Sequence, residues 1–332
     1  MSIPSHLPPV TQIGDRIAQI RLPMTGNPMR YINAYLLDDD DGLTLIDCGW
    51  KADDVAAALD DGLAALGHAV ADVRRLLITH FHYDHYGLAG TLVSRGVAEL
   101  GMHERDWSFL KARRERRGDD DSIVNAWLER NGLPVEPDDE ESPYGRFDYV
   151  EPTLLLEDGQ RVGRLRVVWT PGHSPGHLCF VDTVSGRTFT GDHVLDPVTP
   201  HVGLWHDSGR NPMGEYVESL RTVGALETTG ALPAHGEAFE DLARRVDELL
   251  AHETERERGV LHALDDGPAT AAEVAGKLRW RRRGDRFDQL APEAQQFAVA
   301  ETLAHLQRLA HMQIVRRIDA ANRITWSLVA LP

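Results

Sequence analysis

The chain has 332 residues, of which 42% are hydrophobic, so it can bury a sizeable core, which argues against global disorder. Its formal net charge of −17 argues against non-specific attraction to nucleic acid or to an anionic membrane. The two cysteines, Cys48 and Cys179, imply no disulfide framework, which suits a reducing cytoplasm. The N-terminus has no apolar core of signal-peptide length, and no apolar run approaches the ~20 residues of a membrane helix. We therefore expect a cytoplasmic protein with one large domain and a smaller one.

The first part of the chain predicts strands and helices in alternation. Short aliphatic or β-branched runs, separated by turn residues, predict strands at 16–23, 31–39, 43–49 and 73–79. The acidic stretch "DDDDG" between the second and third runs fits a hairpin turn. Apolar positions at helical spacing predict helices over 53–66 and 85–96. This order predicts an α/β fold built in layers.

Residues 103–150 interrupt the alternation. The stretches 104–117 and 122–133 have helical character, whereas the acidic, proline-containing stretch 134–147 predicts a loop. The runs Asp119–Asp121 and Asp138–Glu141 are expected to be solvated. We interpret the whole span as an insertion over one face of a large domain at 10–250.

The remainder of the chain predicts further strands and then a change of architecture. Strands are expected at 153–159, 164–170, 177–183 and 187–192. A helix over 211–226 precedes a final strand and loop at 231–236, and a long charged helix starts near Asp241. Two further helices and a two-stranded ribbon then predict a small winged-helix-like domain at 253–332.

The stretch "LLITHFHYDHYGLAG" places three imidazoles and a carboxylate directly after a predicted strand. His80 and His82 are two residues apart, so in an extended segment they point the same way and can grip one metal ion. Asp84 and His85 come where the chain turns into a helix and can face a second ion beside the first. Zinc or iron suits such a mixed nitrogen and oxygen site.

These four residues cannot close two metal sites, and later strand ends supply further candidates. They are His173 and His177 in "TPGHSPGH", Asp192 and His193 in "TGDH", and His235 in "PAHG". Together with "THFHYDH" and the opening "NAYLLDDDDGLTLIDCG", these motifs resemble the metallo-β-lactamase fold superfamily over roughly residues 15–240. The set is specific because the motifs occur in the family's order. The resemblance implies a four-layer αββα fold.

The resemblance also implies a set of metal ligands. His80, His82 and His177 would hold the first metal, and Asp84, His85 and His235 the second, with Asp192 as a bridge between them. His177 is chosen over His173 because the second histidine of "PGHSPGH" is taken as the family's ligand. Asp47 would accept a hydrogen bond beneath the ligands, and His173 and His193 are expected to support the site from behind it. One of His193, His201 and His206 could reach the substrate, although ordinary loop hydrogen bonds are the simpler interpretation for all three.

The implied reaction is hydrolysis with two divalent ions, zinc being favoured and iron or manganese compatible. A bridging hydroxide would attack an acyl carbonyl, with Asp84 and Asp192 as catalytic residues that hold the nucleophile and the metal spacing. The motif pair resembles the glyoxalase II and thioesterase-like branch, which implies a thioester, ester or lactone as substrate, as for a hydroxyacylglutathione hydrolase. The C-terminal pattern resembles instead the β-lactamase-like protein 2 type hydrolases, so glutathione specificity does not follow.

Two other functions remain open. A metal-dependent nuclease or phosphodiesterase is favoured by the Arg-rich stretch Arg279–Phe287 but disfavoured by the net charge. A DNA-binding regulator is disfavoured because the helix near Ala294 to Met312 carries few basic residues. We expect a small-molecule acyl substrate as partner, no nucleic acid and no membrane, and a homodimer stays compatible with the sequence.

Overall fold

The computed structural model describes residues 4, 6–14, 16–115, 120–134, 149–206, 211–280 and 284–329. The acidic run Asp138–Glu141, nearly all of the predicted loop at 134–147 and the middle of the Arg-rich stretch lie outside the described residues. Among the helices that are described, none is both long and apolar enough to cross a lipid bilayer.

A seven-stranded sheet forms from the first part of the chain. Its strands are, in spatial order, β1 (Val10–Gly14), β2 (Ile17–Pro23), β3 (Tyr31–Asp39), β4 (Gly42–Ile46), β5 (Val73–Leu77), β6 (Glu99–His103) and β7 (Leu154–Leu156). The first four pair antiparallel, and β4 to β7 pair parallel. In β3 the seven residues 31–37 are all buried, so this strand is covered on both faces.

A second, five-stranded sheet packs against the first. Its order is β12 (Gly230–Pro233), β11 (Arg187–Gly191), β10 (Leu178–Asp182), β9 (Leu165–Trp169) and β8 (Arg161–Val162). Only β11 and β12 pair parallel. Apolar side chains from the two sheets interdigitate, including Tyr35 and Leu37 from the first and Phe180 and Phe189 from the second.

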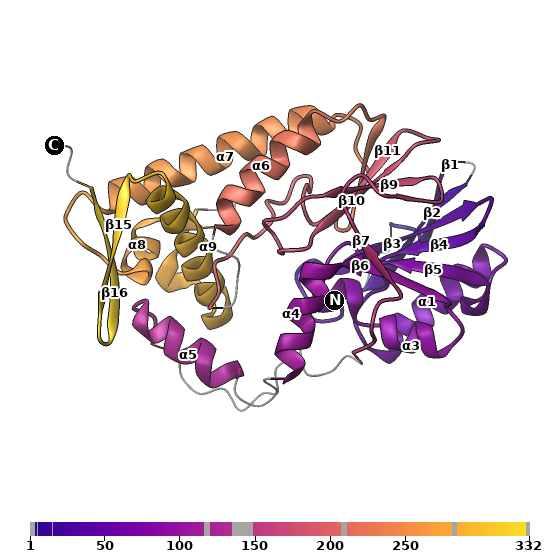
Figure 1. Ribbon diagram of the computed structural model, residues 1–332, viewed down its shortest axis with the longest axis horizontal. Helices are drawn as coiled ribbons and strands as arrows, with labels where there is room; N and C mark the ends of the chain where they lie inside the picture. The colour runs from indigo at the N-terminus through magenta and orange to yellow at the C-terminus, as the bar shows by residue number, and fades with distance from the viewer. Residues whose placement is uncertain are drawn as a thin grey trace.

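Helices cover the outer face of each sheet (Figure 1). Beside the first sheet lie α1 (Asp53–Ala65), the short turn η1 (Val70–Asp72), α2 (Tyr83–Tyr86) and α3 (Ala89–Ser94). The second sheet is covered by α6 (Pro212–Gly224) and α7 (Leu242–Ala263). Both of these helices begin at a side-chain cap, where Asn211 accepts from the Gly214 amide and Asp241 from the Arg244 amide. The expected four-layer αββα architecture is therefore confirmed.

The insertion contributes to two cores rather than covering one face. Its first helix, α4 (Glu104–Glu115), buries Leu110 in the core of the first sheet. Its second helix, α5 (Asp120–Arg130), buries Leu128 in a separate core near the C-terminus. The insertion thus connects the sheet layers with the C-terminal region.

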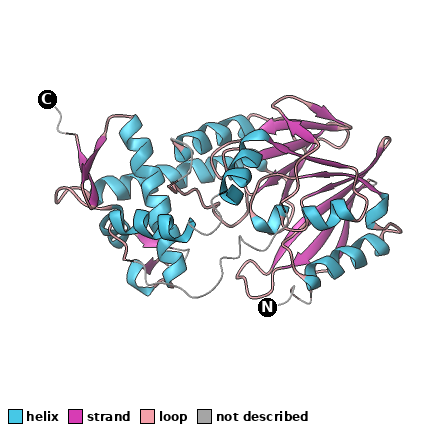
Figure 2. Cartoon of the chain, turned by 60° about the horizontal axis from the view of Figure 1, so that its bottom comes forward, coloured by secondary structure: helices cyan, strands magenta, loops and turns pink. Residues whose placement is uncertain are grey.

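The C-terminal region has its own hydrophobic core. Figure 2 shows its helices and its two-stranded ribbon grouped at the end of the molecule that carries the C-terminus. Its elements are α8 (Ala271–Lys277), the hairpin β13 (Arg279–Trp280) and β14 (Asp285–Arg286), the turn η3 (Phe287–Gln289), α9 (Pro292–His311), and the ribbon β15 (Val315–Ala320) and β16 (Arg323–Leu328). The helix α7 runs unbroken across the predicted boundary at 253, with Val246 in the core of the second sheet and Val260 in the C-terminal core. The helices and ribbon follow the expected order, and the winged-helix assignment stays a prediction.

Candidate metal centre

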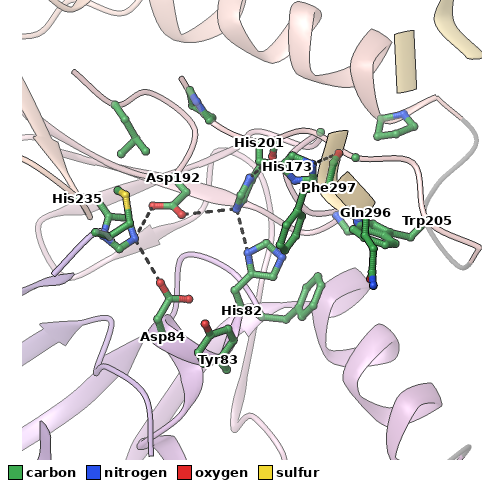
Figure 3. A pocket seen from close by; sticks show the side chains of 18 of the residues that line it. His82, Tyr83, Asp84, His173, Asp192, His201, Trp205, His235, Gln296 and Phe297 are labelled. Atoms are coloured by element: carbon green, nitrogen blue, oxygen red, sulfur yellow. Dashed lines mark hydrogen bonds and ion pairs between the residues drawn. The ribbon is translucent and has the colours of Figure 1, made fainter. Parts of the chain in front are cut away.

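The candidate ligands lie in loops and in the short helix α2, at one edge of the two sheets. Figure 3 labels His82, Asp84, His173, Asp192 and His235 among them. The segment His80–His85 follows β5, His173 lies between β9 and β10, Asp192 follows β11, and His235 follows β12. The pairs β4–β5 and β11–β12 are parallel, so the carboxyl ends of their strands share an edge. Segments distant in sequence thereby converge on one place.

Three imidazoles form the first cluster. The Nε2 atom of His80 lies 2.9 Å from Nδ1 of His82 and 3.1 Å from Nε2 of His173, and the latter two nitrogens are 3.0 Å apart. Nitrogens bound to one tetrahedral zinc ion at ~2.05 Å would be separated by about 3.3 Å, close to this arrangement. Three ring nitrogens facing one point cannot all be satisfied by protons, so the cluster fits a single cation.

The second cluster combines a carboxylate with two imidazoles. The Nε2 atom of His235 lies 3.3 Å from an Asp84 oxygen, and Nε2 of His85 lies 3.7 Å from the same oxygen. The Nε2 atom of His85 is buried without a hydrogen-bond partner in the described part of the chain. Because buried polar atoms in native proteins are rarely left unsatisfied, this orphaned nitrogen fits a second cation.

Asp192 lies between the two clusters. One of its oxygens is 3.7 Å from Nε2 of His173 and 3.6 Å from Nε2 of His85, and the other is 3.5 Å from Nε2 of His235. That second oxygen, Oδ1, is also buried with no hydrogen-bond partner among the described residues. The position between both clusters suits a carboxylate shared by two ions.

The structure corrects the choice of His177 as the third ligand of the first metal. The backbone amide of Asp192 donates to Nε2 of His177 at 3.2 Å, so this nitrogen is already used as an acceptor. The other ring nitrogen, Nδ1, lies 2.8 Å from the hydroxyl of Thr170. A Cβ atom at Gly191 would approach Nε2 of His177 to 2.7 Å, which shows how closely the chain packs there. His177 therefore supports the backbone of Asp192. His173 occupies the position in the first cluster that the sequence assigned to His177.

The far nitrogen of several clustered imidazoles is held by an oxygen. The Nδ1 atom of His85 donates to Asp47 at 2.8 Å, that of His235 to the Tyr31 carbonyl at 3.0 Å, and that of His173 to the His201 carbonyl at 2.7 Å. Such partners fix the ring orientation and raise the basicity of a ligand. Asp47 lies beneath the second cluster, and it also accepts from the Thr79 amide at 2.8 Å.

The two clusters differ in electrostatics. Burial lowers the pKa values of His80, His82 and His173, which keeps these rings in the neutral form that binds metals. Burial also lowers the pKa values of His85 and His235, but neighbouring carboxylates outweigh it and raise them above the ordinary value. The pKa values of the Asp84 and Asp192 carboxyl groups shift the opposite way. Burial raises these pKa values, but the neighbouring rings of His85 and His235 have the larger effect, so the net result is a lowered pKa for both acids.

Asp106 is a supporting residue that the sequence did not indicate. Its buried carboxylate accepts from the Phe81 amide at 2.9 Å, the Ser174 hydroxyl at 2.8 Å and the Gly176 amide at 2.5 Å. Burial raises the pKa of Asp106 to about 7, although these hydrogen bonds lower it. One side chain from α4 thus ties together the two loops that supply the first cluster. No motif or spacing marks it, because it lies inside the insertion.

The remaining predicted histidines separate into two groups. His193 is buried, with its ring 5.0 Å from that of Tyr216 and 5.7 Å from that of His177, and burial lowers its pKa to about 3. It therefore packs behind the site. His201 and His206 line the cavity in front of the clusters.

A cavity of about 490 Å³ opens from the clusters. His82, Asp84, His173, Asp192 and His235 line one end of it. Its walls come from the loop at 24–29, the helix α4, the segment 195–206 and the first turns of α9. This volume lies within the usual range for small-molecule sites.

Known structures share this fold across nearly the whole chain. A metallo-beta-lactamase family protein from Thermus thermophilus is similar at a TM-score of 0.82 and 31% sequence identity, covering 96% of this chain and 100% of that one. A beta-lactamase domain protein from Burkholderia ambifaria is similar at a TM-score of 0.78 and 25% identity, covering 96% and 95%. The C-terminal region is therefore included in both likenesses.

Curated relatives and a family model agree with the structural likeness. The probable metallo-hydrolase YqjP of Bacillus subtilis (strain 168) is 26% identical over 81% of this chain and 85% of its own length. The atrochrysone carboxyl ACP thioesterase of Passalora fulva is 28% identical over 78% of this chain and 65% of its own length. The family model described as Metallo-beta-lactamase superfamily matches residues 28–235, which is more than half of the chain. This chain belongs to the metallo-beta-lactamase superfamily.

Proposed function

We propose that the chain is a dinuclear metal-dependent hydrolase that cleaves a thioester or ester by attack on its acyl carbonyl. The observation that carries this proposal is the pair of ligand clusters, joined by Asp192, at one end of a cavity large enough for a small molecule. A single cluster would support only a mononuclear site, and clusters buried away from any cavity would support only structural metals.

The chain's residues divide the binding of two ions between them. His80, His82 and His173 would hold the first, Asp84, His85 and His235 the second, and Asp192 would contact both. Imidazole and carboxylate ligands suit zinc, and iron or manganese tolerates the same set. The neutral state of the first three rings is the form that ligation requires.

Two divalent ions in such a site provide an activated water near neutral pH and polarise a carbonyl oxygen. The chain itself holds the reacting groups in place. Asp192 lies 3.7 Å from Nε2 of His173 and 3.5 Å from Nε2 of His235, and so sets the spacing of the two clusters. Asp84 lies 3.3 Å from the same nitrogen of His235, within the second cluster. Asp47 and the Tyr31 carbonyl hold the rings of the second cluster, and Asp106 holds the loops of the first.

A thioester is the favoured substrate. One curated relative bears the name of an ACP thioesterase, and it shares 28% identity over 78% of this chain. Against phosphodiesters stand the net charge of −17 and the carboxylates of Glu215 and Glu293, which line the cavity. A glutathione thioester and a lactone are acyl substrates of the same kind, so both are included in the substrate panel.

The test is a substrate panel on the purified, metal-loaded protein. The panel contains an acyl thioester, a p-nitrophenyl ester, a lactone, a glutathione thioester and bis-p-nitrophenyl phosphate, and kcat/KM is measured for each. We expect the thioester or ester to be cleaved fastest and His173→Ala to abolish that turnover. Faster cleavage of the phosphodiester, or turnover that survives His173→Ala, would overturn the proposal.

A further inference from the structure

The cavity extends well beyond the candidate metal centre. Its far side is formed by Gln296 and Phe297 near the start of α9, together with Trp205, whereas Asp84 and His235 lie at the opposite end (Figure 3). An acetyl or lactoyl group bound at the clusters would occupy only a small part of about 490 Å³. A further part of the substrate is therefore expected to fill the remaining volume of the cavity.

The far wall is aromatic. The ring centroids of Trp205 and Phe297 are 5.8 Å apart at 89°, and those of His201 and Phe297 are 4.9 Å apart at 79°, which are favourable edge-to-face arrangements. Phe297 remains 36% exposed although it is a large apolar side chain. Phe109 from α4 also lines the cavity. A wall of this composition gains free energy when an apolar group displaces water from it.

The far wall is fixed relative to the clusters by a short chain of hydrogen bonds. The ring of His173 donates to the carbonyl of His201 at 2.7 Å, and the ring of His201 donates in turn to the carbonyl of Phe297 at 3.1 Å. The Leu204 amide also donates to the Ala300 carbonyl at 2.9 Å, which joins the same segment to α9. These hydrogen bonds therefore hold Phe297 of the C-terminal region, together with the segment that carries His201 and Trp205, at a set distance from the first cluster.

We infer that the substrate carries an extended apolar acyl chain and that Phe297 and Trp205 are specificity-determining residues that receive its far end. The inference rests on the proposed hydrolase function and names the substrate class of the same site. It assigns the C-terminal region the task of measuring chain length, because α9 supplies the end of the cavity.

The test compares acetyl, hexanoyl and decanoyl p-nitrophenyl esters in the full-length, metal-loaded protein. We expect kcat/KM to rise with chain length, and Phe297→Ala or Trp205→Ala to lower it about tenfold for the decanoyl ester and under about twofold for the acetyl ester. The matched control is Met312→Ala, an apolar truncation at the end of the same helix at a side chain 51% exposed. It should leave all three values unchanged.

Two outcomes would overturn the inference: a wild-type preference for the acetyl ester, or an equal loss for all three esters in Phe297→Ala. A binding measurement separates this failure from failure of the proposed function. By calorimetry, the thioether S-decyl-N-acetylcysteamine, which has no scissile thioester, should bind the wild type at least about tenfold more tightly than Phe297→Ala. If this thioether binds as expected but no ester is cleaved, the hydrolase proposal is wrong and the apolar site stands; if it binds both proteins equally, the apolar site is wrong.

Discussion

Burial has opposite net results for the histidine pKa values of the two ligand clusters, of which the second is the more completely buried. In the first cluster three imidazoles face one another, the nearby carboxylate of Asp192 does not offset burial, and the pKa values of His80, His82 and His173 fall. In the second, the carboxylate of Asp84 faces His85 and His235, whose pKa values rise. The comparison shows that the charge beside a buried imidazole, and not burial alone, sets the pKa of the ring. A neutral ring can bind a metal ion directly, whereas a protonated ring must first lose its proton.

The largest effect is expected at the residue that both clusters share. Asp192→Asn removes the charge that lies 3.5 to 3.7 Å from His173, His85 and His235. Loss of partners beyond the ligands costs 10–100-fold, so loss of this carboxylate should lower kcat/KM by more than about 100-fold. Kinetics on the folded variant, checked by circular dichroism, provide the measurement. Activity within about tenfold of the wild type would show that Asp192 is not shared.

The next prediction separates the two histidines of one loop. His173→Ala should remove one metal equivalent because its ring belongs to the first cluster, whereas His177→Gln should retain both since that ring supports the Asp192 backbone. Metal content by elemental analysis compares the two variants directly. Two equivalents in the His173 variant and one in the His177 variant would restore the assignment made from the sequence.

Acid should remove the two ions in a defined order. A raised pKa keeps His85 and His235 protonated up to a higher pH, so protons displace the metal of the second cluster first as the pH falls. The lowered pKa values in the first cluster delay its loss to more acidic conditions. Metal retention against pH is measured in His173→Ala, which keeps only the second cluster, and in His235→Ala, which keeps only the first. Loss at a higher pH from His235→Ala would refute the order.

The smallest effects are expected from residues that only hold the ligands. Asp106→Asn should weaken the first metal about 10–100-fold, because an amide cannot accept from all three donors at Phe81, Ser174 and Gly176. Asp47→Asn should weaken the second metal by a similar factor, because it alters the partner of His85. Each variant serves as the control for the other in metal titrations with a chelating indicator. If either variant weakened both metals equally, the separate support of the clusters would be disproved.

The sequence predicts best what depends on local spacing. His80 and His82 are two residues apart after a strand, and the structure places both in one cluster. His173 and His177 belong to a loop between two strands, where spacing does not determine which ring turns towards the cluster. The choice of His177 from the sequence is therefore wrong, and His173 lies in the cluster. Asp106 acts through three contacts that are distant in sequence, so no pattern marks it.

The fold shows the same division. Alternating strands and helices predict the layers, because each element's own residues define its buried face. The predicted helix at 85–96 is instead two short helices, α2 and α3, which are separated at Gly87 and Leu88. The chain is closely packed at this break, since a Cβ atom at Gly87 would come within 2.4 Å of the Tyr83 carbonyl oxygen. The long charged helix predicted from Asp241 corresponds to α7, but the predicted domain boundary at 253 falls inside it, because this one helix contributes to two cores.

The most direct test of the central claim is the number of metal ions per chain. Elemental analysis of the purified protein, after dialysis against metal-free buffer at neutral pH, should find two equivalents of a divalent metal, zinc foremost. In Asp192→Asn prepared in parallel, the number should fall. A wild-type protein that holds no metal, even after incubation with excess zinc, would contradict the account.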